Sequence, residues 1–498
     1  MAATARKRPG ETRVLRFLLG DAVQTLTAPD PNMTVLDYLR LVAGRSGTKE
    51  GCAEGDCGAC TVVLGTRDGA RLRYRAVNAC ILFLPVLDGK QLLTVEDLRA
   101  PDGTLHPVQR AMVDHHGAQC GFCTPGFIMS LFALYKAGET DGQRLDRRRI
   151  DDAIAGNLCR CTGYRPIADA ALAMGGGGDV DHFAAREAET VARLRAIRRR
   201  GTLALAGAGR RYFAPRSAAA LARLLIAHPD ATLLAGGTDV GLWVTKQHRD
   251  LDTLIHVGDV TELRTLRQVN GHLEIGAAVT YGDAVAAIAR HYPDFAELIR
   301  RLGSVQIRNS GTLGGNIANG SPIGDSMPAL IALGARLVLR RGARRREMAL
   351  DEFFLDYRKT ALTRGAFIER IRLPIHGAAR RFATYKVTKR FDQDISAVCG
   401  AFSLALDGRR VRDIRICYGG MAAIPKRARH CERALIGGEW SEASVDAAAR
   451  ALARDYAPIT DMRASGDYRM LVAGNLLRKF FMEGEAQAPD LRVLAFAR

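Results

Sequence analysis

The sequence lacks several features that mark common classes of protein. No apolar run approaches the roughly 20 residues that a membrane-spanning helix needs. Residues 1–20 are basic, but they contain no clean apolar core, no cleavage site and no adjacent Arg-Arg pair. They therefore resemble neither a secretory signal nor a twin-arginine signal. We expect a cytoplasmic protein without a membrane segment.

Aromatic residues are scarce, at 6% of the chain, although the chain is strongly basic. Its 72 lysines and arginines exceed the 53 acidic residues by 19. Nucleic-acid-binding modules concentrate such charge on one face or motif, whereas arginine here is spread along the whole chain without an aromatic-rich basic module. We expect no nucleic-acid partner. An anionic cofactor or an acidic protein partner accounts better for the excess charge.

The cysteines do not suggest a disulfide framework. There are eleven, an odd number, and the chain shows no secretory signal. Eight of them fall in residues 52–161, which indicates metal or redox chemistry in a reducing compartment. The other three lie far downstream, and we interpret Cys399, Cys417 and Cys431 as ordinary buried thiols.

Five regions differ in their pattern of apolar residues and turns, and 498 residues suffice for several domains. Short apolar runs with turns predict strands, apolar residues at helical spacing predict helices, and a run of four glycines predicts flexibility. The fold class is therefore α+β multidomain. In order, the regions are a small twisted sheet with one helix (13–95), a helical domain (96–172), a flexible linker (173–200), a mixed α/β domain with glycine loops (201–378) and a last α+β domain (381–498).

The first set of cysteines has the spacing of plant-type ferredoxins. In KEGCAEGDCGACT the pattern is C-x4-C-x2-C, and a fourth cysteine follows nineteen residues later. Glycines in this loop let the backbone approach an inorganic cluster and offer N–H donors to its sulfides. Structural zinc sites usually show two C-x2-C pairs instead. We predict a [2Fe–2S] cluster held by Cys52, Cys57, Cys60 and Cys80.

The second set combines C-x2-C with C-x-C, in QCGFCTPG and GNLCRCTGY. On spacing alone this set could hold either zinc or an iron–sulfur cluster. Both pairs precede expected helix starts, where free N–H groups and the helix dipole favour an anionic cluster. The expected ligands are Cys120, Cys123, Cys159 and Cys161.

Together, KEGCAEGDCGACT, QCGFCTPGFIMS and GNLCRCTGYRPI resemble the iron–sulfur portion of the molybdenum hydroxylases, the family of xanthine dehydrogenases and aldehyde oxidases. The resemblance implies a ferredoxin-like β-grasp domain followed by a four-helix domain, each with one [2Fe–2S] cluster. It also implies that the second cluster lies next to molybdopterin. The glutamine before that cluster's first cysteine contacts this cofactor, and here it is Gln119.

Two glycine-rich segments lie farther along, LLAGGTDVGLWV and GTLGGNIANGSPIGDSMP. Their backbone N–H groups could bind phosphate, although most glycine loops are merely turns, and neither segment has the G-x-G-x-x-G pattern of a Rossmann fold. Both resemble the FAD-binding loops of the same family, whose flavin domain has the vanillyl-alcohol-oxidase type of fold. By that resemblance the FAD residues are Leu233, Leu234, Ala235, Gly236, Gly237, Thr238, Asp239, Val240, Thr312, Leu313, Gly314, Gly315, Asn316, Asp325, Ile368 and Lys386.

Three details bear on the flavin prediction. Animal members of the family carry an aromatic residue where this chain has Leu302, so any aromatic stacking there is absent or comes from elsewhere. The segment KRFDQDISAV (389–398) also resembles the family, and its acidic residues could set access to the flavin. A cation such as Lys386 near the flavin could stabilise negative charge on the reduced ring.

The expected cofactors define an electron-transfer chain. Iron–sulfur clusters carry single electrons, whereas a flavin can accept two singly and deliver a hydride, here to NAD⁺. The domains account for nearly all of the sequence, so we expect the molybdopterin and the substrate pocket on a large partner subunit, with no substrate-oxidising residue on this chain. The order of clusters before flavin resembles bacterial xanthine dehydrogenase small subunits. It implies hypoxanthine and xanthine oxidation by an (αβ)2 heterotetramer.

Three alternatives remain at this stage. Another molybdenum hydroxylase, acting on an aldehyde or an N-heterocycle, would have a similar small subunit. An iron–sulfur flavoprotein reductase could work without molybdenum, although QCGFCTPG and GNLCRCTGYRP are typical of a cluster domain that faces molybdopterin. A zinc-stabilised interaction module would not be an enzyme, and it would be colourless.

Overall fold

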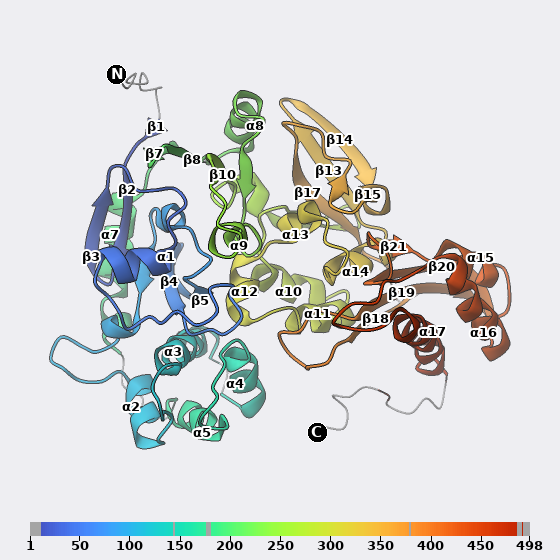
Figure 1. Ribbon diagram of the computed structural model, residues 1–498, viewed down its shortest axis with the longest axis horizontal. Helices are drawn as coiled ribbons and strands as arrows, with labels where there is room; N and C mark the ends of the chain where they lie inside the picture. Colours follow the sequence, from blue (N-terminus) through green and yellow to red (C-terminus); the bar gives the residue numbers. More distant parts are fainter. Residues whose placement is uncertain (1–10, 143–144, 176–180, 378–379, 486–490, 492–498) are drawn as a thin grey trace. The chain divides into compact units, whose positions relative to one another are not determined.

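The computed structural model describes residues 11–142, 145–175, 181–377, 380–485 and 491 (Figure 1). The chain divides into two compact units. Unit 1 comprises Met1–Thr261 and Gly303–Gly311, and unit 2 comprises Glu262–Leu302 and Thr312–Arg498. None of the helices in the described ranges combines the length and the hydropathy that a membrane span requires.

Unit 1 begins with a five-stranded sheet in the order β3-β2-β6-β4-β5. Strands β2 and β3 form a hairpin around Gly20, and β2 also pairs in parallel with β6. Thr34 caps the start of the first helix, because its hydroxyl oxygen accepts from the Asp37 N–H at 3.1 Å. The elements are β2 (Leu15–Leu19), β3 (Ala22–Leu26), α1 (Val35–Asp37), the π-helical η1 (Tyr38–Val42), β4 (Thr61–Asp68), β5 (Arg71–Asn78), η2 (Leu84–Leu87), β6 (Gln91–Leu93) and η3 (Val95–Asp97).

Four helices follow, which is the number that the family resemblance implies. They share a core of buried residues that includes Phe127, Phe132 and Ile167. The second of these four helices ends at Asp141, where Gly142 with φ of 64° supplies its left-handed cap. The helices are α2 (Pro107–Asp114), α3 (Thr124–Asp141), α4 (Arg147–Ile154) and α5 (Arg165–Ala173).

The region expected to be a flexible linker, 173–200, differs from that expectation over most of its described part. Residues 176–180, which hold most of the glycine run, lie outside the described residues. Beyond them, α6 (His182–Ala185) and α7 (Glu187–Ile197) are packed helices, and Leu194 is fully buried. Asp181 is buried between Lys136 (3.0 Å) and His106 (3.0 Å), which ties this segment to the helical domain.

Arg199 ends the same segment in a buried double ion pair. Its guanidinium contacts Asp88 at 2.5 Å and also contacts Asp259. Two acidic groups therefore surround one cation, and the segment is tied to both neighbouring sheets of unit 1. An unpaired buried charge would be costly, so the pairing fixes residues that the arginine-rich sequence suggested were solvated.

The second sheet of unit 1 has the order β1-β7-β8-β10-β9. It shares one hydrophobic core with the first sheet, and the members of this core include Phe17, Phe83 and Leu254. Its last strand, β9, leads directly into the first glycine segment. The elements are β1 (Glu11–Thr12), β7 (Thr202–Gly207), β8 (Arg210–Ala214), α8 (Ala218–Ala227), β9 (Thr232–Leu234), α9 (Val240–Thr245), β10 (Thr253–His256) and α12 (Val305–Ser310). The 3-10 helix η4 (Thr261–Arg264) spans the division between the units.

Unit 2 contains an antiparallel sheet in the order β11-β12-β17-β13-β14. A short hairpin, β15 and β16, follows η5. The elements are β11 (Leu266–Val269), β12 (His272–Gly276), α10 (Tyr281–Ala289), α11 (Pro293–Arg300), α13 (Leu313–Asn319), α14 (Ser326–Ala332), β13 (Arg336–Arg341), β14 (Arg344–Ala349), η5 (Leu350–Glu352), β15 (Phe354–Asp356), β16 (Lys359–Thr360) and β17 (Phe367–Pro374).

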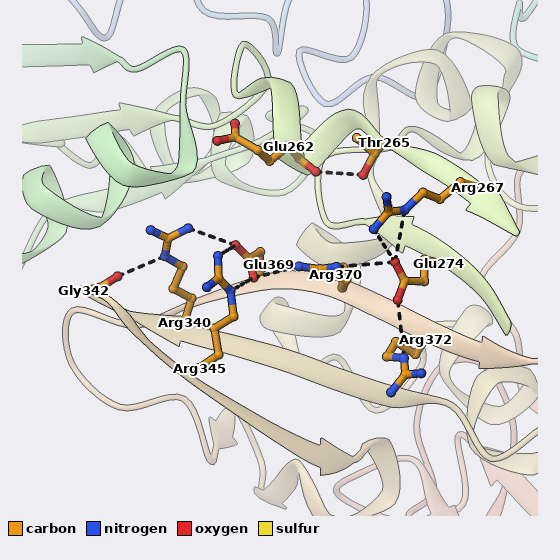
Figure 2. Close-up of polar contacts among 10 residues, drawn as sticks. All are labelled: Glu262, Thr265, Arg267, Glu274, Arg340, Gly342, Arg345, Glu369, Arg370 and Arg372. Carbon is orange, nitrogen blue, oxygen red and sulfur yellow. Dashed lines mark hydrogen bonds and ion pairs between the residues drawn. The ribbon is translucent and has the colours of Figure 1, made fainter. Parts of the chain in front are cut away.

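Arginines of this sheet surround two buried carboxylates (Figure 2). Glu369 accepts from Arg345 at 2.7 Å and from Arg340 at 3.0 Å, and Glu274 accepts from Arg267 at 3.0 Å. Burial alone would raise the pKa of Glu369, but the hydrogen bonds from these arginines lower that pKa to about 2. Part of the arginine surplus therefore serves the fold.

The rest of unit 2 is a four-stranded antiparallel sheet, β18-β19-β20-β21, covered by helices. Phe402 and Tyr418 of the sheet and Phe480 of the last helix are fully buried in one core. The elements are β18 (Arg381–Val387), β19 (Val398–Asp407), β20 (Arg410–Gly419), β21 (Lys426–Arg427), α15 (Arg429–Leu435), α16 (Glu442–Ala451), η6 (Leu452–Arg454) and α17 (Gly466–Met482).

Candidate functional site

The first cysteine set is gathered by one pair of strands. Cys60 directly precedes β4, and Cys80 comes two residues after β5 ends. Because Thr61 of β4 lies opposite Asn78 of β5, the two ends meet, and the sulfur of Cys60 lies 3.3 Å from that of Cys80.

The loop before β4 turns its backbone N–H groups toward Cys52. The sulfur of Cys52 accepts from the N–H of Asp56 at 3.3 Å, of Cys57 at 3.3 Å and of Glu54 at 3.5 Å. Hydrogen bonds from the thiols of Cys57 and Cys80 lower the pKa of Cys52 well below its usual range. These donors fit an anionic, thiolate-bound cluster. The loop reaches this shape through positive φ at Gly55 (85°), Gly58 (68°) and Ala53 (54°).

The second cysteine set lies among the helices of the same unit. Cys123 is the N-cap residue of α3, and Cys159 is buried, whereas Cys120 and Cys161 are exposed. Burial and a hydrogen bond with Cys159 raise the pKa of Cys123 to about 12, and a hydrogen bond with Cys120 raises the pKa of Cys161. The four thiols therefore meet in two adjacent pairs.

The expectation that both cysteine pairs lie at helix N-termini is met by the first pair, because Cys123 is the N-cap residue of α3, but not by the second. Cys159 and Cys161 lie in the loop before α5, which begins only at Arg165. The loop supplies donors in another way: Cys159 lies 3.1 Å from the Thr162 hydroxyl and accepts from the Thr162 N–H at 3.4 Å. Burial raises the pKa of Cys159, but these contacts outweigh burial and lower that pKa. Such donors also suit an anionic cluster.

Neither set is arranged around a single ion. Among the described residues, no group of three or more His, Cys, Asp or Glu side chains meets the arrangement for one bound metal ion. All eleven cysteines are unpaired thiols in the structure.

The two cysteine sets are joined through the backbone. The N–H of Leu158 donates to the carbonyl oxygen of Cys57 at 2.9 Å, and Leu158 directly precedes Cys159. One hydrogen bond therefore connects a residue of the first set with a neighbour of the second. Gln119, the residue expected to contact molybdopterin, is exposed beside the exposed Cys120.

The first glycine segment packs against the residue that follows Cys80. Ile81, which follows Cys80, packs so closely that a Cβ added at Gly241 would lie 2.7 Å from its carbonyl oxygen. A Cβ added at Gly236 would lie 1.8 Å from the carbonyl oxygen of Ser310. Glycine is therefore required at Gly236 and Gly241 by packing, and Gly237 has the left-handed φ of 75°.

This segment leaves a row of donors unused. In the part of the chain that the structure describes, the backbone N–H groups of Ala235 through Asp239 donate to no other residue. Consecutive free N–H groups in a glycine-rich turn are a common phosphate-binding arrangement. The donor set therefore fits the pyrophosphate of FAD. Leu233 and Leu234 belong to β9, and Val240 begins α9.

The second glycine segment, in unit 2, behaves differently. Its N–H groups are already used: Leu313 donates to Val279, Gly314 to Ala277, and Gly315 to the hydroxyl of Thr312. Gly314 fits closely, because an added Cβ would lie 2.5 Å from Ala277. Asn316 accepts from Ser326 at 2.9 Å. The segment contains the capped N-terminus of α13, and these polar groups have partners within unit 2.

The remaining predicted flavin residues of unit 2 divide into a pair and a single residue. The ammonium of Lys386 lies 2.5 Å from Asp325, whose other oxygen accepts from Ser396 at 2.6 Å. The charge expected to face a reduced flavin is therefore balanced by Asp325. Ile368 stands apart from this pair, buried in β17 opposite Leu339.

An aromatic ring does occur near Leu302. Phe391, in the segment 389–398, lies with its ring centroid 4.3 Å from the guanidinium carbon of Arg301. The same guanidinium donates to the carbonyl oxygen of Phe391 at 3.1 Å. Phe391 thus packs against the arginine that directly precedes Leu302.

Sequence reasoning missed one group of buried polar residues next to the cysteines. Gln306 of α12 contacts Thr61, Ser130 and Asn157, and two of these lie within two residues of a predicted cluster ligand. A signal was available only in part: polar residues stand beside cysteines in CTVVLG and GNLCRC, but nothing in the sequence links them to position 306.

Known proteins match the chain along most of its length. Among curated relatives are xanthine dehydrogenases of Emericella nidulans (32% identity over 89% of this chain and 36% of the relative) and Drosophila subobscura (32%, 82% and 34%). A carbon monoxide dehydrogenase structure from Hydrogenophaga pseudoflava, which lacks the Mo-pyranopterin moiety of the molybdenum cofactor, matches at 31% identity and TM-score 0.52. The match covers 54% of this chain and 94% of that chain.

Four family models match successive regions. They are a 2Fe-2S iron–sulfur cluster binding domain (19–84), a [2Fe-2S] binding domain (94–172), a FAD binding domain in molybdopterin dehydrogenase (206–376) and a CO dehydrogenase flavoprotein C-terminal domain (383–484). The chain belongs to the molybdenum hydroxylase family. As in the sequence prediction, this molybdenum hydroxylase chain has two [2Fe–2S] domains, a FAD-binding domain and a C-terminal domain in an α+β fold, and it spans about a third of the length of those xanthine dehydrogenases.

Proposed function

We propose that this chain is the iron–sulfur and flavin subunit of a xanthine dehydrogenase. A large partner subunit would carry molybdopterin and oxidise hypoxanthine to xanthine and xanthine to urate, in a cytoplasmic (αβ)2 heterotetramer. Electrons would pass to NAD⁺ through this chain. The xanthine dehydrogenases among its relatives support the substrate, and eleven unpaired cysteines favour a reducing compartment.

The residues would divide the work as follows. The two cysteine sets would each hold a [2Fe–2S] cluster, and the free N–H groups of residues 235–239 would bind the FAD pyrophosphate. Thr312–Asn316, Asp325, Ile368 and Lys386 would complete the flavin-binding residues. When bound, the clusters supply one-electron transfer, and FAD couples it to hydride transfer to NAD⁺.

One observation carries this proposal: the first cysteine set contacts both the second set and the first glycine segment. The Leu158 N–H connects Cys57 with the second set at 2.9 Å. Ile81, next to Cys80, packs against Gly237 and Gly241 of the first glycine segment. These contacts support the order from second cluster to first cluster to flavin.

The exposed residues of the second cysteine set support the proposal of a molybdopterin-carrying partner subunit. Gln119, Cys120 and Cys161 are exposed. The amide of Gln119 can both donate and accept hydrogen bonds, as a pterin edge would require. This end would receive electrons from the molybdopterin subunit.

A second candidate is a hydroxylase for a different substrate, such as an aldehyde or an N-heterocycle. The similarity to a carbon monoxide dehydrogenase chain keeps it open, because iron–sulfur and flavin domains alone do not determine the substrate. An iron–sulfur flavoprotein reductase without molybdenum is a third possibility.

The test uses the native complex, isolated anaerobically through a tag on this chain. Xanthine is added without an acceptor, and the visible iron–sulfur and flavin absorption is followed. Bleaching that NAD⁺ reverses is the predicted result. Bleaching by NADH but not by xanthine would contradict the substrate and move the proposal to another hydroxylase or a reductase. A colourless preparation without iron would contradict the cofactors themselves.

A further inference from the structure

Gln306 is a buried glutamine whose partners all lie beside the cysteine loops. Its side chain is 1% exposed. The amide nitrogen lies 3.0 Å from the Ser130 hydroxyl, 3.1 Å from the Thr61 hydroxyl and 3.1 Å from the side-chain oxygen of Asn157. Two N–H groups thus serve three acceptors, from the first sheet, α3 and the loop before α5.

The partners extend the contact to both predicted clusters. Thr61 follows Cys60, and its hydroxyl donates to Gly58, next to Cys57. Asn157 stands two residues before Cys159 and donates to Gly58 at 3.0 Å. Alongside this network runs the hydrogen bond from Leu158 to Cys57. The network therefore joins the loop of the first set to the loop of the second.

The helix that carries Gln306 belongs to unit 1, although the residues on both sides of Gly303–Gly311 belong to unit 2. Within unit 1 it makes further contacts around the first cysteine set. A Cβ added at Gly55, inside the first cysteine loop, would lie 3.2 Å from Ile307. Asn309 donates to the carbonyl oxygen of Ala76 at 3.0 Å, and the Ser310 carbonyl meets Gly236 of the flavin segment. Short α12 thus touches the first cysteine loop, the second loop and the flavin segment.

We propose that Gln306 is a positioning residue for electron transfer, holding the two cluster-binding loops at a fixed separation. The inference rests on the proposed function. The step concerned moves one electron from the reduced second cluster to the oxidised first cluster, and no bond or proton changes. Because the rate of such a step depends steeply on separation, a network that fixes both loops sets the rate without touching either cluster.

Gln91 provides a matched comparison within the same unit. It is also 1% exposed, its amide nitrogen donates to the carbonyl oxygen of Gly20 at 3.0 Å, and its amide oxygen, like that of Gln306, has no partner among the described residues. Its partner is the turn between β2 and β3, which holds no cysteine. The two glutamines are therefore equally buried and both donate through the amide nitrogen, but only Gln306 joins the two cysteine loops.

The test compares Gln306→Met with Gln91→Met in the full-length holoprotein. Iron and acid-labile sulfide are measured first. The protein is then reduced anaerobically with dithionite. The electron paramagnetic resonance spectrum is recorded, and the splitting that arises from the magnetic interaction between the two reduced clusters is measured. Finally, a light-generated reductant delivers one electron, and the rate of equilibration between the clusters is followed.

Gln306→Met is expected to retain both clusters, to change the splitting and to slow equilibration about tenfold, the usual effect of losing an outer hydrogen bond near a metal centre. Gln91→Met is expected to change neither quantity. Unchanged splitting and rate in a fully loaded Gln306→Met protein would overturn the inference, as would an equal effect of Gln91→Met.

If Gln306→Met loses its clusters, the same measurements are made on Ser130→Ala. This variant removes one hydrogen-bonding group of the network by deleting a single oxygen atom. A changed splitting with full cluster content supports the inference, and an unchanged one overturns it. A wild-type protein without two iron–sulfur signals would contradict the proposed function. If the wild type holds both clusters but Gln306→Met changes neither the splitting nor the rate, only this inference is contradicted.

Discussion

Gln119 is exposed beside Cys120 and is the side chain that we expect to meet molybdopterin. Gln119→Ala is predicted to leave the iron and sulfide content unchanged, because an exposed substitution costs little stability. It should slow substrate-driven bleaching about fivefold, the effect of one lost hydrogen bond of about 1 kcal/mol. Stopped-flow absorbance of the complex with xanthine measures this rate, and the equally exposed Gln247→Ala is the control. Loss of the second cluster in Gln119→Ala would instead assign this residue a structural role.

Individual residues also show how far sequence reasoning reaches. The cysteine ligands follow from short-range spacing, since C-x4-C-x2-C and a glycine-rich loop specify a cluster locally. The Lys386–Asp325 pair and the Gln306 network join residues more than sixty positions apart. No local pattern fixes such pairs, because either partner alone is compatible with a solvated surface position.

The first glycine segment makes the sharpest structural prediction for flavin binding. Gly236→Ala would place a Cβ 1.8 Å from the Ser310 carbonyl oxygen, so the segment must move. We expect the variant to lose most of its FAD while retaining iron in both clusters. The flavin-to-protein and iron-to-protein ratios of the purified protein measure this outcome. Gly377→Ala is the control, because nothing lies within 4 Å of a Cβ added there. Normal flavin content in Gly236→Ala would contradict the assignment of this segment.

The segment of α6 and α7 is held by charge. Burial alone would raise the pKa of Asp181, but hydrogen bonds with His106 and the Ala184 N–H and the charge of Lys136 lower it to about 2. A depressed carboxyl pKa stabilises the folded state above the unfolded pKa of 3.8, and this contribution disappears as pH falls from about 4 to about 2. The shift corresponds to about 2 kcal/mol.

Asp181→Asn is accordingly predicted to destabilise this segment at pH 7 by about 3 kcal/mol, because the buried Lys136 loses the charge of its buried carboxylate partner. Hydrogen exchange of the peptide covering residues 181–197 measures the local opening free energy, with the exposed Asp407→Asn as the control. The difference in opening free energy from wild type should narrow as pH falls from about 4 toward 2. Equal protection of variant and wild type at pH 7 would contradict this role.

The same segment shows why the linker prediction differed from the structure. A glycine run followed by an arginine-rich, weakly apolar stretch is typical of a solvated linker. The helices form because Val191 and Leu194 pack against Leu18 and Leu72, while Asp181 and Arg199 find buried partners of opposite charge. These stabilising contacts come from distant elements, which local patterns do not reveal.

At the scale of the whole chain, the division into two compact units does not follow the order of the domains along the sequence. The FAD-binding family model matches residues 206–376, and these residues fall partly in each of the two compact units. The division passes on either side of α12, whose buried partners are in unit 1. The packing of this six-residue helix against an earlier part of the chain cannot be predicted from the local spacing of apolar residues.

The order of electron transfer is the central claim, and Cys80→Ser tests it most directly. NADH is added anaerobically to the complex, and the flavin and both clusters are followed by rapid freezing and electron paramagnetic resonance. The variant is predicted to lose the first-cluster signal, to reduce its flavin at the wild-type rate and to reduce the second cluster at least about tenfold more slowly. If the second cluster were reduced at the wild-type rate, the route through the first cluster would be contradicted.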